Sequence, residues 1–340
     1  MKAALVQPDN SLKVSEVPSP EPGPGSLVVK VAYCGICGSD VHMLDAGMMP
    51  TGSVPGHELS GSIAAIGQGV EDWREGDPVV VLPLDPCFAC EPCRGWNVSL
   101  CQDGVARAYG LGGLPGGFSE YMQVRPSMLF RVPDGMDLKT AALNEPWAVA
   151  VHGVNLSGFK VGGSAVVMGA GPIGLLCVSA LQAAGAAGIY VSEPDPFRAD
   201  KARALGVDAV FNPKTDYTGA AVQEKLGRAP EYVFDCAGTD SSMEEAAGIA
   251  GVHGHVVALG VPMRNTTLFP LPCFLKETRF SFSFGYTYRE FGECLRLLGS
   301  GRVRPDVVVS GVMPLGEIGS AMKRLHGSGH AKILIDCQAV

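Results

Sequence analysis

The sequence has no excess of positive charge. Its 340 residues include 26 lysines and arginines against 34 aspartates and glutamates, which gives a formal net charge of -8. The basic residues are mixed with acidic ones along the whole chain, so no basic patch could follow a phosphate backbone. The composition therefore predicts a protein without a nucleic-acid partner.

The N-terminus lacks the features of a secretory signal. MKAALVQPDNSLKV has only a short apolar run, followed by polar residues and no small-residue cleavage site, and we interpret it as a first strand. The cysteines lack the regular framework of a small secreted domain, because their number is odd and most lie inside apolar segments. These features predict a reducing, cytoplasmic setting.

Residues 161–192 lack charged side chains altogether, and by length alone they could cross a membrane. Seven glycines and one proline, however, divide the run into strand, turn, helix, turn and strand. A buried parallel strand and the helix that covers it are equally apolar. We therefore expect the interior of a globular domain here, and no membrane partner.

Two different secondary-structure patterns follow one another along the chain. A chain of this length is expected to form two domains that share a cleft. Up to about residue 147, short β-type runs alternate with glycine and proline turns, which is typical of an antiparallel, barrel-like domain. Strands then alternate with helices, which predicts a parallel doubly wound sheet. Its expected strands are 165–168, 189–192, 232–235, 255–260 and 279–284.

The last fifty residues contain further elements but no repeat. The pattern predicts a helix near 288–299, a strand at 306–310, a helix near 316–326 and a final strand at 332–336.

A glycine-rich loop follows the strand at 165–168 and opens a helix. The glycines permit a tight turn and the close approach of a pyrophosphate, which the free N–H groups of the helix N-terminus then stabilise. Pro172 suits the first helical turn. The loop therefore predicts dinucleotide contacts from Gly169, Gly171, Pro172, Ile173 and Gly174.

An acidic residue ends the next strand. Glu193 lies nineteen residues beyond Gly174, where its carboxylate could accept both ribose hydroxyls and would repel a 2′-phosphate. NAD is therefore expected rather than NADP. Asp195 competes on spacing, but it is better explained as the cap of a helix that ends at Gly206. Arg198 is either a 2′-phosphate contact or a solvated helix arginine.

Two short motifs offer metal ligands, CGICGSDVH at 34–42 and GHE at 56–58. A catalytic zinc site uses about three protein groups and leaves one position open. Cys37 and His57 are the first two expected ligands, and either Glu58 or Glu145 could complete or support the set. Cys34 is expected to be a small buried hydrophobe.

Cys87, Cys90, Cys93 and Cys101 form a second cluster, with the spacing C-x2-C-x2-C-x7-C. Four thiolates close a tetrahedral zinc site without an open position, so such a site holds a loop in shape and cannot bind a substrate. Disulfides disagree with a reducing compartment, and the spacing is not typical of an iron–sulfur centre. We therefore predict a structural zinc.

In combination, these motifs resemble the zinc-dependent medium-chain alcohol and polyol dehydrogenases, in the branch of sorbitol and threonine dehydrogenases. The resemblance runs essentially end to end through CGICGSDVH, VPGHELSGSIAAIGQGVEDWREGDPVVV, the cysteine cluster, GGFSEYM, NEPWAVAVHG, VMGAGPIGLL, VFDCAG and VVALGVP. It implies an α/β protein with a GroES-like β-barrel catalytic domain and a Rossmann cofactor domain. Their implied ranges are 1–147 with 288–340 and 148–287, respectively.

The resemblance also implies roles for individual residues. The catalytic set would be Cys37, Ser39, His42, His57, Glu58 and Glu145, the carboxylates being those of the polyol and threonine branch. Ser39 and His42 would relay a proton to solvent. Within VVALGVP we expect cofactor contacts from Leu259, Gly260 and Val261. The family's usual homodimer or homotetramer would form through the strand near 279–284.

The implied reaction is the reversible NAD-linked oxidation of a secondary alcohol, namely a polyol, sugar or diol, to a ketone, with two zinc ions per chain. L-Threonine or another amino alcohol could use the same groups. Ethanol- and cinnamyl-type members carry a cysteine near the Glu145 position, which disfavours them. A zinc- and dinucleotide-binding protein without catalysis is the alternative from another class.

Two absences bear on the substrate. The loop at 42–54 has no obvious cationic group for a phosphorylated sugar, which favours a neutral alcohol. The arginine–tyrosine pair of many polyol dehydrogenases aligns with Ser283 and Phe284, so substrate contacts from that strand are not predicted.

Overall fold

A six-stranded parallel sheet organises the second half of the chain in the computed structural model, which describes residues 1–262 and 265–339. The strand order is β10-β9-β8-β11-β12-β13, which is the 3-2-1-4-5-6 order of a Rossmann fold. The strands are β8 (Ser164–Met168), β9 (Gly188–Ser192), β10 (Ala209–Phe211), β11 (Tyr232–Asp235), β12 (His255–Ala258) and β13 (Arg279–Phe282).

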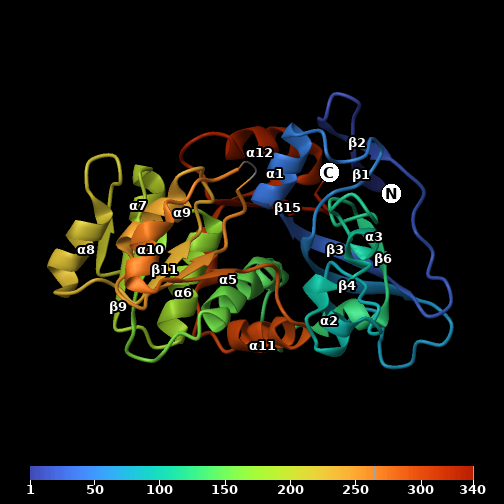
Figure 1. Ribbon diagram of the computed structural model, residues 1–340. Coiled ribbons are helices and arrows are strands. Elements are labelled where there is room, and N and C mark those ends of the chain that lie inside the picture. Colours follow the sequence, from blue (N-terminus) through green and yellow to red (C-terminus); the bar gives the residue numbers. More distant parts are fainter. Residues whose placement is uncertain (263–264, 340) are drawn as a thin grey trace. The chain divides into compact units, whose positions relative to one another are not determined.

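Helices connect these strands and flank the sheet (Figure 1). The connecting helices are α6 (Pro172–Ala183), α7 (Pro196–Ala204), α8 (Thr218–Leu226), α9 (Ser242–Ile249) and α10 (Pro270–Lys276), and α5 (Asn144–Leu156) precedes β8. Every residue of β8 and β9 is buried, and so are the central residues of α6. The uncharged run at 161–192 is therefore a strand, a helix and a strand, as predicted. None of the described helices has the length and apolar character to cross a bilayer.

The first half of the chain forms mostly antiparallel sheets. Strands β1 (Lys2–Val6) and β2 (Leu12–Glu16) pair with each other, and the larger sheet has the order β14-β15-β3-β4-β5-β7, with β6 on β3. Its strands are β3 (Leu27–Gly35), β4 (Glu58–Ile66), β5 (Pro78–Val81), β6 (Tyr121–Val124), β7 (Leu129–Arg131), β14 (Val309–Pro314) and β15 (Lys332–Asp336).

Strand β15 comes from the end of the chain and pairs antiparallel with β3 (Figure 1). The chain accordingly divides into two compact units. The first comprises Met1–Glu145, Tyr286–Gly301 and Val309–Val340, and the second comprises Pro146–Gly285 and Arg302–Val308. The domain boundaries that the resemblance implies stay a prediction.

Short helices complete the first unit. They are α1 (Gly38–Asp45), α2 (Glu91–Arg94), α3 (Gly104–Arg107), α4 (Leu138–Ala141), α11 (Tyr288–Gly299) and α12 (Ile318–Leu325), with the 3₁₀ turns η1 (Val98–Leu100), η2 (Pro126–Met128) and η4 (Leu315–Glu317).

Two sequence predictions were wrong in detail. The parallel sheet has a sixth strand, β10, whose three residues are too few for a period-2 pattern to be recognised. Residues 306–310 are not one strand, because Pro305–Val308 forms the 3₁₀ turn η3 and β14 begins only at Val309. Proline lacks an N–H group and favours the first turn of a helix, which explains the turn at this point.

Candidate functional site

Cys37, His57 and Glu58 come together in the first unit. One potential ligand atom of each lies within 4.8 Å of the others. Cys37 caps the N-terminus of α1, and His57 and Glu58 lie where β4 begins. In a tetrahedral zinc site with typical Zn–S and Zn–N bonds, neighbouring ligand atoms are about 3.6 Å apart. The thiol, imidazole and carboxylate therefore fit a single zinc ion.

Asp40 lies behind His57. Its Oδ1 is 3.4 Å from His57 Nδ1, and its Oδ2 accepts a hydrogen bond of 2.9 Å from the Cys37 amide. Burial lowers the pKa of His57, but the Asp40 charge outweighs burial and raises this pKa well above its ordinary value. A carboxylate on one ring nitrogen orients the other toward a metal. Asp40 thus positions two predicted ligands together.

Lys332 neutralises Glu58. Its Nζ lies 2.6 and 2.7 Å from the two Glu58 carboxylate oxygens and also donates to the Ile36 carbonyl at 3.0 Å. Lys332 is 1% exposed and Glu58 is fully buried. Gly35, opposite Glu58 in the β3–β4 pair, makes room, since a Cβ there would lie 2.2 Å from the Glu58 carboxylate.

Replacing Lys332 by methionine is expected to lower the free energy of unfolding by about 3–5 kcal/mol, because the Glu58 charge would stay buried without its partner. Urea unfolding at one fixed protein concentration measures this change. Lys323→Met on the exposed face of α12 is the control and should change stability by less than about 0.5 kcal/mol. Equal stabilities of the two variants would contradict the ion-pair assignment.

Glu145 lies in the first turn of α5 and is not among the three clustered ligands. The pKa of its carboxyl is raised to about 7, mainly by burial. The charge of the nearby His57 acts to lower this pKa, and the charge of Glu58 acts to raise it. Burial, and after it the nearby Glu145 charge, raise the pKa of the Tyr286 hydroxyl well above its ordinary value. Glu145 is therefore electrostatically part of the same site.

Ser39 and His42 both lie on α1. Ser39 is half-buried in its first turn and His42 is exposed one turn later. Residues three apart share one face of a helix, which is compatible with a relay between them. Their role as a proton relay stays a prediction.

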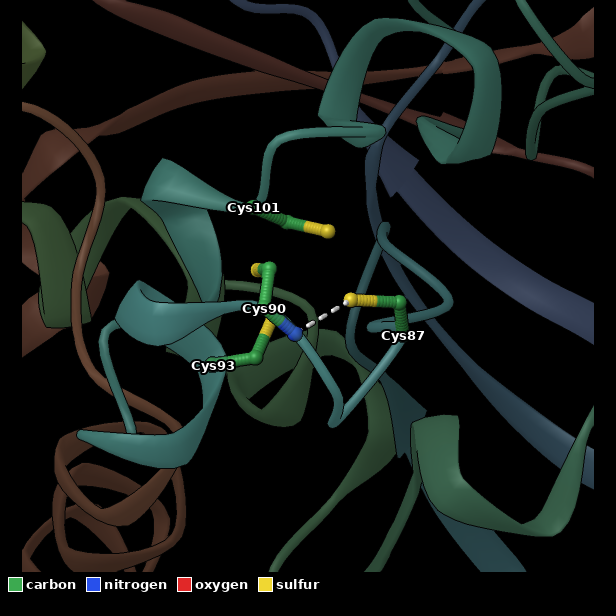
Figure 2. Close-up of side chains that lie close together, drawn as sticks. All are labelled: Cys87, Cys90, Cys93 and Cys101. Atoms are coloured by element: carbon green, nitrogen blue, oxygen red, sulfur yellow. Dashed lines mark hydrogen bonds between the residues drawn. The ribbon is translucent and has the colours of Figure 1, made fainter.

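The four remaining predicted ligands converge in a lobe of the first unit that we call the cysteine lobe, residues 85–107. The sulfur atoms of Cys87, Cys90, Cys93 and Cys101 lie within 4.8 Å of one another (Figure 2). Hydrogen bonds from the amides of Cys90 and Ala89 lower the pKa of Cys87 to about 6, whereas burial raises that of Cys93 to about 12. Four thiolates at this spacing need a cation, and zinc fits the donor set.

The second unit holds the glycine loop. Gly169 has a left-handed φ of 86°, and a Cβ on Gly174 would lie 1.8 Å from the Gly169 carbonyl, so helix and strand pack too closely for any side chain. A Cβ on Gly171 would meet nothing within 4 Å. That open space is where a pyrophosphate would approach the N-terminus of α6.

A cavity of about 810 Å³ adjoins this loop within the second unit. It is lined by Gly169, Gly171, Glu193 and Arg198, among others, and includes Lys214. Among the described residues, Pro172, Ile173, Gly174, Leu259, Gly260 and Val261 do not line it. Leu259 and Gly260 instead follow β12 at the carboxyl edge of the sheet, where their amides donate to the Asp235 carbonyl.

Glu193 is 4% exposed and holds two backbone segments together. Its Oε2 accepts from the Ala170 amide at 2.6 Å and its Oε1 from the Asp195 amide at 2.8 Å. Asp195 caps α7 through the Arg198 amide at 3.0 Å, as predicted. The acid is thus fixed against the glycine loop, beside the cavity.

Comparison with known proteins agrees with this geometry. Residues 23–134 match the alcohol dehydrogenase GroES-like domain, and residues 172–300 match the zinc-binding dehydrogenase family. The 2-dehydro-3-deoxy-L-galactonate 5-dehydrogenase of Pseudoalteromonas atlantica is 34% identical over 100% of this chain and 99% of its own. The (R,R)-butanediol dehydrogenase of Bacillus subtilis is 34% identical over 94% of each chain.

A solved structure extends the match to three dimensions. A chain of Sinorhizobium meliloti 1021, crystallised with NADP, superposes with a TM-score of 0.92 at 30% identity, over 98% of both chains. The predicted combination of a GroES-like and a Rossmann domain is confirmed. The chain therefore belongs to the family of zinc-dependent medium-chain alcohol and polyol dehydrogenases.

Proposed function

We propose that the protein catalyses the reversible, NAD-linked oxidation of a secondary alcohol, namely a polyol, sugar or diol, to a ketone. The observation that carries this proposal is the convergence of Cys37, His57 and Glu58 within 4.8 Å in a chain of this family. The named relatives, which act on a diol and a sugar acid by their names, support a substrate with a secondary hydroxyl.

The chain's own residues divide the work. Cys37, His57 and Glu58 would hold zinc, Asp40 orients His57, and Lys332 balances the charge of Glu58. When bound, zinc supplies a Lewis acid that favours loss of the alcohol proton, and NAD supplies the hydride acceptor. Ser39 and His42 would carry the proton toward solvent along α1.

NAD is the proposed cofactor because Glu193, fixed by two amides, presents a buried negative charge beside the cavity. A 2′-phosphate would meet that charge. Arg198 and Lys214 line the same cavity and are the groups that could favour NADP instead. A second zinc in the cysteine lobe is part of the proposal, and a cytoplasmic setting stays a prediction.

A substrate panel followed at the NADH absorbance band tests the function. Polyols, sugars, vicinal diols and L-threonine are each supplied with NAD and, in parallel, with NADP. We expect turnover with a neutral secondary alcohol and NAD. Turnover with L-threonine alone would favour an amino-alcohol dehydrogenase. Binding of zinc and NAD without any turnover would contradict catalysis.

We also propose that two copies associate through the edge of the parallel sheet. Strand β13 is the last strand of the sheet, and several apolar side chains of the described residues between 261 and 284 are exposed. These are Val261, Phe269, Leu271, Phe274, Leu275, Phe282 and Phe284, each more than half exposed. Soluble proteins rarely leave a sheet edge and this many large apolar side chains uncovered.

Replacing Phe282 by lysine is expected to convert the oligomer to monomers, because a charge on an edge strand opposes strand pairing. Light scattering during gel filtration measures the mass. Val105→Lys, at a residue that is 88% exposed in the cysteine lobe, is the control and should keep the wild-type mass. An unchanged mass for Phe282→Lys would contradict the proposed interface.

A further inference from the structure

Two helices of the first unit end at the same place. Asp45 is the last residue of α1, and His326 is the C-terminal cap of α12. The His326 Nε2 lies 2.8 Å from the Asp45 Oδ2, and its Nδ1 lies 3.1 Å from the Met322 carbonyl oxygen of α12. One imidazole ring therefore joins the end of α1 to the end of α12, and we call this contact between Asp45 and His326 the helix clasp.

Both contacts of the His326 ring require a proton on the nitrogen. A carboxylate and a backbone carbonyl can only accept hydrogen bonds, and a neutral imidazole has a single N–H group. The protonated ring has two N–H groups and donates to both partners. Its positive charge also lies at two helix C-termini, where the helix dipoles favour a cation. The geometry therefore favours the protonated ring.

Asp45 dominates the electrostatic surroundings of this ring. The hydrogen bond to Asp45, and then the bond to the Met322 carbonyl, raise the pKa of His326 above its ordinary value of 6.5, whereas burial acts to lower it. Strands β2 and β15 pack against α12. The other titratable or charged residues on these strands and on the two helices with their caps are Lys13, Glu16, Asp40, His42, Glu317, Lys323, Arg324, Lys332 and Asp336. Of the charges on the described residues, that of Asp45 is the one that shifts the pKa of the ring.

The helix clasp lies on the segment that connects two predicted metal ligands. Cys37 caps the start of α1, the helix carries Ser39 and His42, and the chain then runs on from Asp45 to His57. With eight residues, α1 is about 12 Å long. A restraint on the end of so short a helix is passed to its beginning, where Cys37 lies.

We propose that protonated His326 is a positioning residue for the predicted metal site: it joins the C-terminal ends of α1 and α12 and thereby restrains the segment between Cys37 and His57. The neutral ring keeps only one of its two hydrogen bonds. The inference rests on the proposed function, because it takes Cys37 and His57 as ligands of a catalytic zinc.

The direction of the pH dependence follows from the raised pKa of His326. A group whose pKa is higher in the folded than in the unfolded protein stabilises the fold fully below its unfolded pKa. The helix clasp is therefore complete below pH 6.5 and is lost as the pH rises through the raised value.

Hydrogen exchange in the last turn of α1 tests the helix clasp itself. The amides of Ala46, Gly47 and Met48 donate to carbonyls of α1, so their exchange reports the opening of this turn. At a pH of about 6, we expect His326→Gln to exchange these amides about two- to fivefold faster than wild type, the effect of a half-exposed charge at a helix C-terminus. At a pH of about 9.5 the two should agree, because the neutral ring and the glutamine amide each make one neutral contact. Quenched-flow exchange with mass-spectrometric detection measures the rates, and Asp45→Asn should behave like His326→Gln.

Release of zinc to a chelator tests whether the helix clasp reaches the metal site. The full-length, zinc-loaded protein is mixed with excess chelator, and the phase that is absent in Cys37→Ala is assigned to the catalytic zinc. At a pH of about 6, His326→Gln and Asp45→Asn should each release this zinc about two- to fivefold faster than wild type, and at a pH of about 9.5 at the wild-type rate. Lys323→Met, which removes an exposed charge from the same helix, is the control and should match wild type at both pH values.

Three results would overturn the proposal. Wild-type exchange rates in His326→Gln at a pH of about 6 would remove the helix clasp, and a difference that persists at a pH of about 9.5 would show that protonation does not control it. Faster exchange without faster zinc release would leave a surface contact with no positioning role. Failure of the proposed function would look different, as the wild type would then hold no zinc that depends on Cys37, while the exchange rates of α1 would still differ between wild type and His326→Gln.

Discussion

Cys37→Ala is expected to reduce turnover by about a thousandfold or more while leaving the affinity for NAD within about twofold of wild type. Cys37 is one of three clustered ligands, and without its thiolate the site would lose its metal. Lewis-acid stabilisation is worth several kcal/mol, and about 4 kcal/mol corresponds to a thousandfold in rate. Steady-state rates with the best alcohol of the panel and NAD titration by fluorescence measure the two quantities.

Cys34→Ala is the matched control. Cys34 lies three residues earlier on β3 and is fully buried, but it is not among the clustered ligands. It should keep its zinc and most of its activity, with only the modest stability loss of a small core truncation. Unchanged turnover in Cys37→Ala would disprove the catalytic-zinc assignment.

Cys90→Ala is expected to remove the second zinc and to lower the melting temperature by about 5 °C or more. A closed four-thiolate site contributes folding free energy directly, and about 2 kcal/mol already shifts the melting temperature by several degrees in a chain of this size. Calorimetry and the zinc content per chain measure the effect.

The exposed lobe residue Leu100 offers a control, since Leu100→Ala changes the lobe surface without touching a ligand. It should keep both zinc ions and the wild-type melting temperature within about 2 °C. A Cys90→Ala variant that is as stable as wild type and correctly assembled, yet inactive, would contradict a structural role for this cluster.

Local signals were enough for much of the fold. The glycine loop, the Asp195 cap and the boundaries of α11 and β15 follow from residues that lie next to one another in the chain. Such signals act over one turn or one strand, where glycine, proline and capping side chains restrict the backbone directly. The strand β10 has only three residues, which are too few to show an alternating pattern in the sequence.

The supporting residues of the site could not be predicted in the same way. Lys332 meets Glu58 across 274 residues, and His326 meets Asp45 across 281. In the sequence, a lysine at the start of KILID looks like any lysine at a strand end, and only the fold buries it. Asp40 alone had a local signal, because an acid three residues after a helix cap is typical of a capping arrangement.

The two cysteine-containing clusters differ in how directly the sequence predicts them. Spacing alone identified Cys87, Cys90, Cys93 and Cys101, and the structure brings their sulfur atoms together. Cys37 and His57 are twenty residues apart and were expected as zinc ligands from two separate short motifs, whereas the roles of Ser39 and His42 came only from the family resemblance. The structure now brings Cys37 and His57 within reach of Glu58, which leaves Glu145 as the supporting carboxylate in our proposal.

The location of zinc in crystals of the holoenzyme tests the central claim most directly. An anomalous difference map measured at the zinc absorption edge is expected to show two peaks per chain. One should lie about 2.3 Å from the Cys37 sulfur and about 2.1 Å from a His57 nitrogen, and the other among the four lobe cysteines. A peak in the cysteine lobe with none at Cys37 and His57, in crystals of protein that turns over its alcohol, would contradict the account.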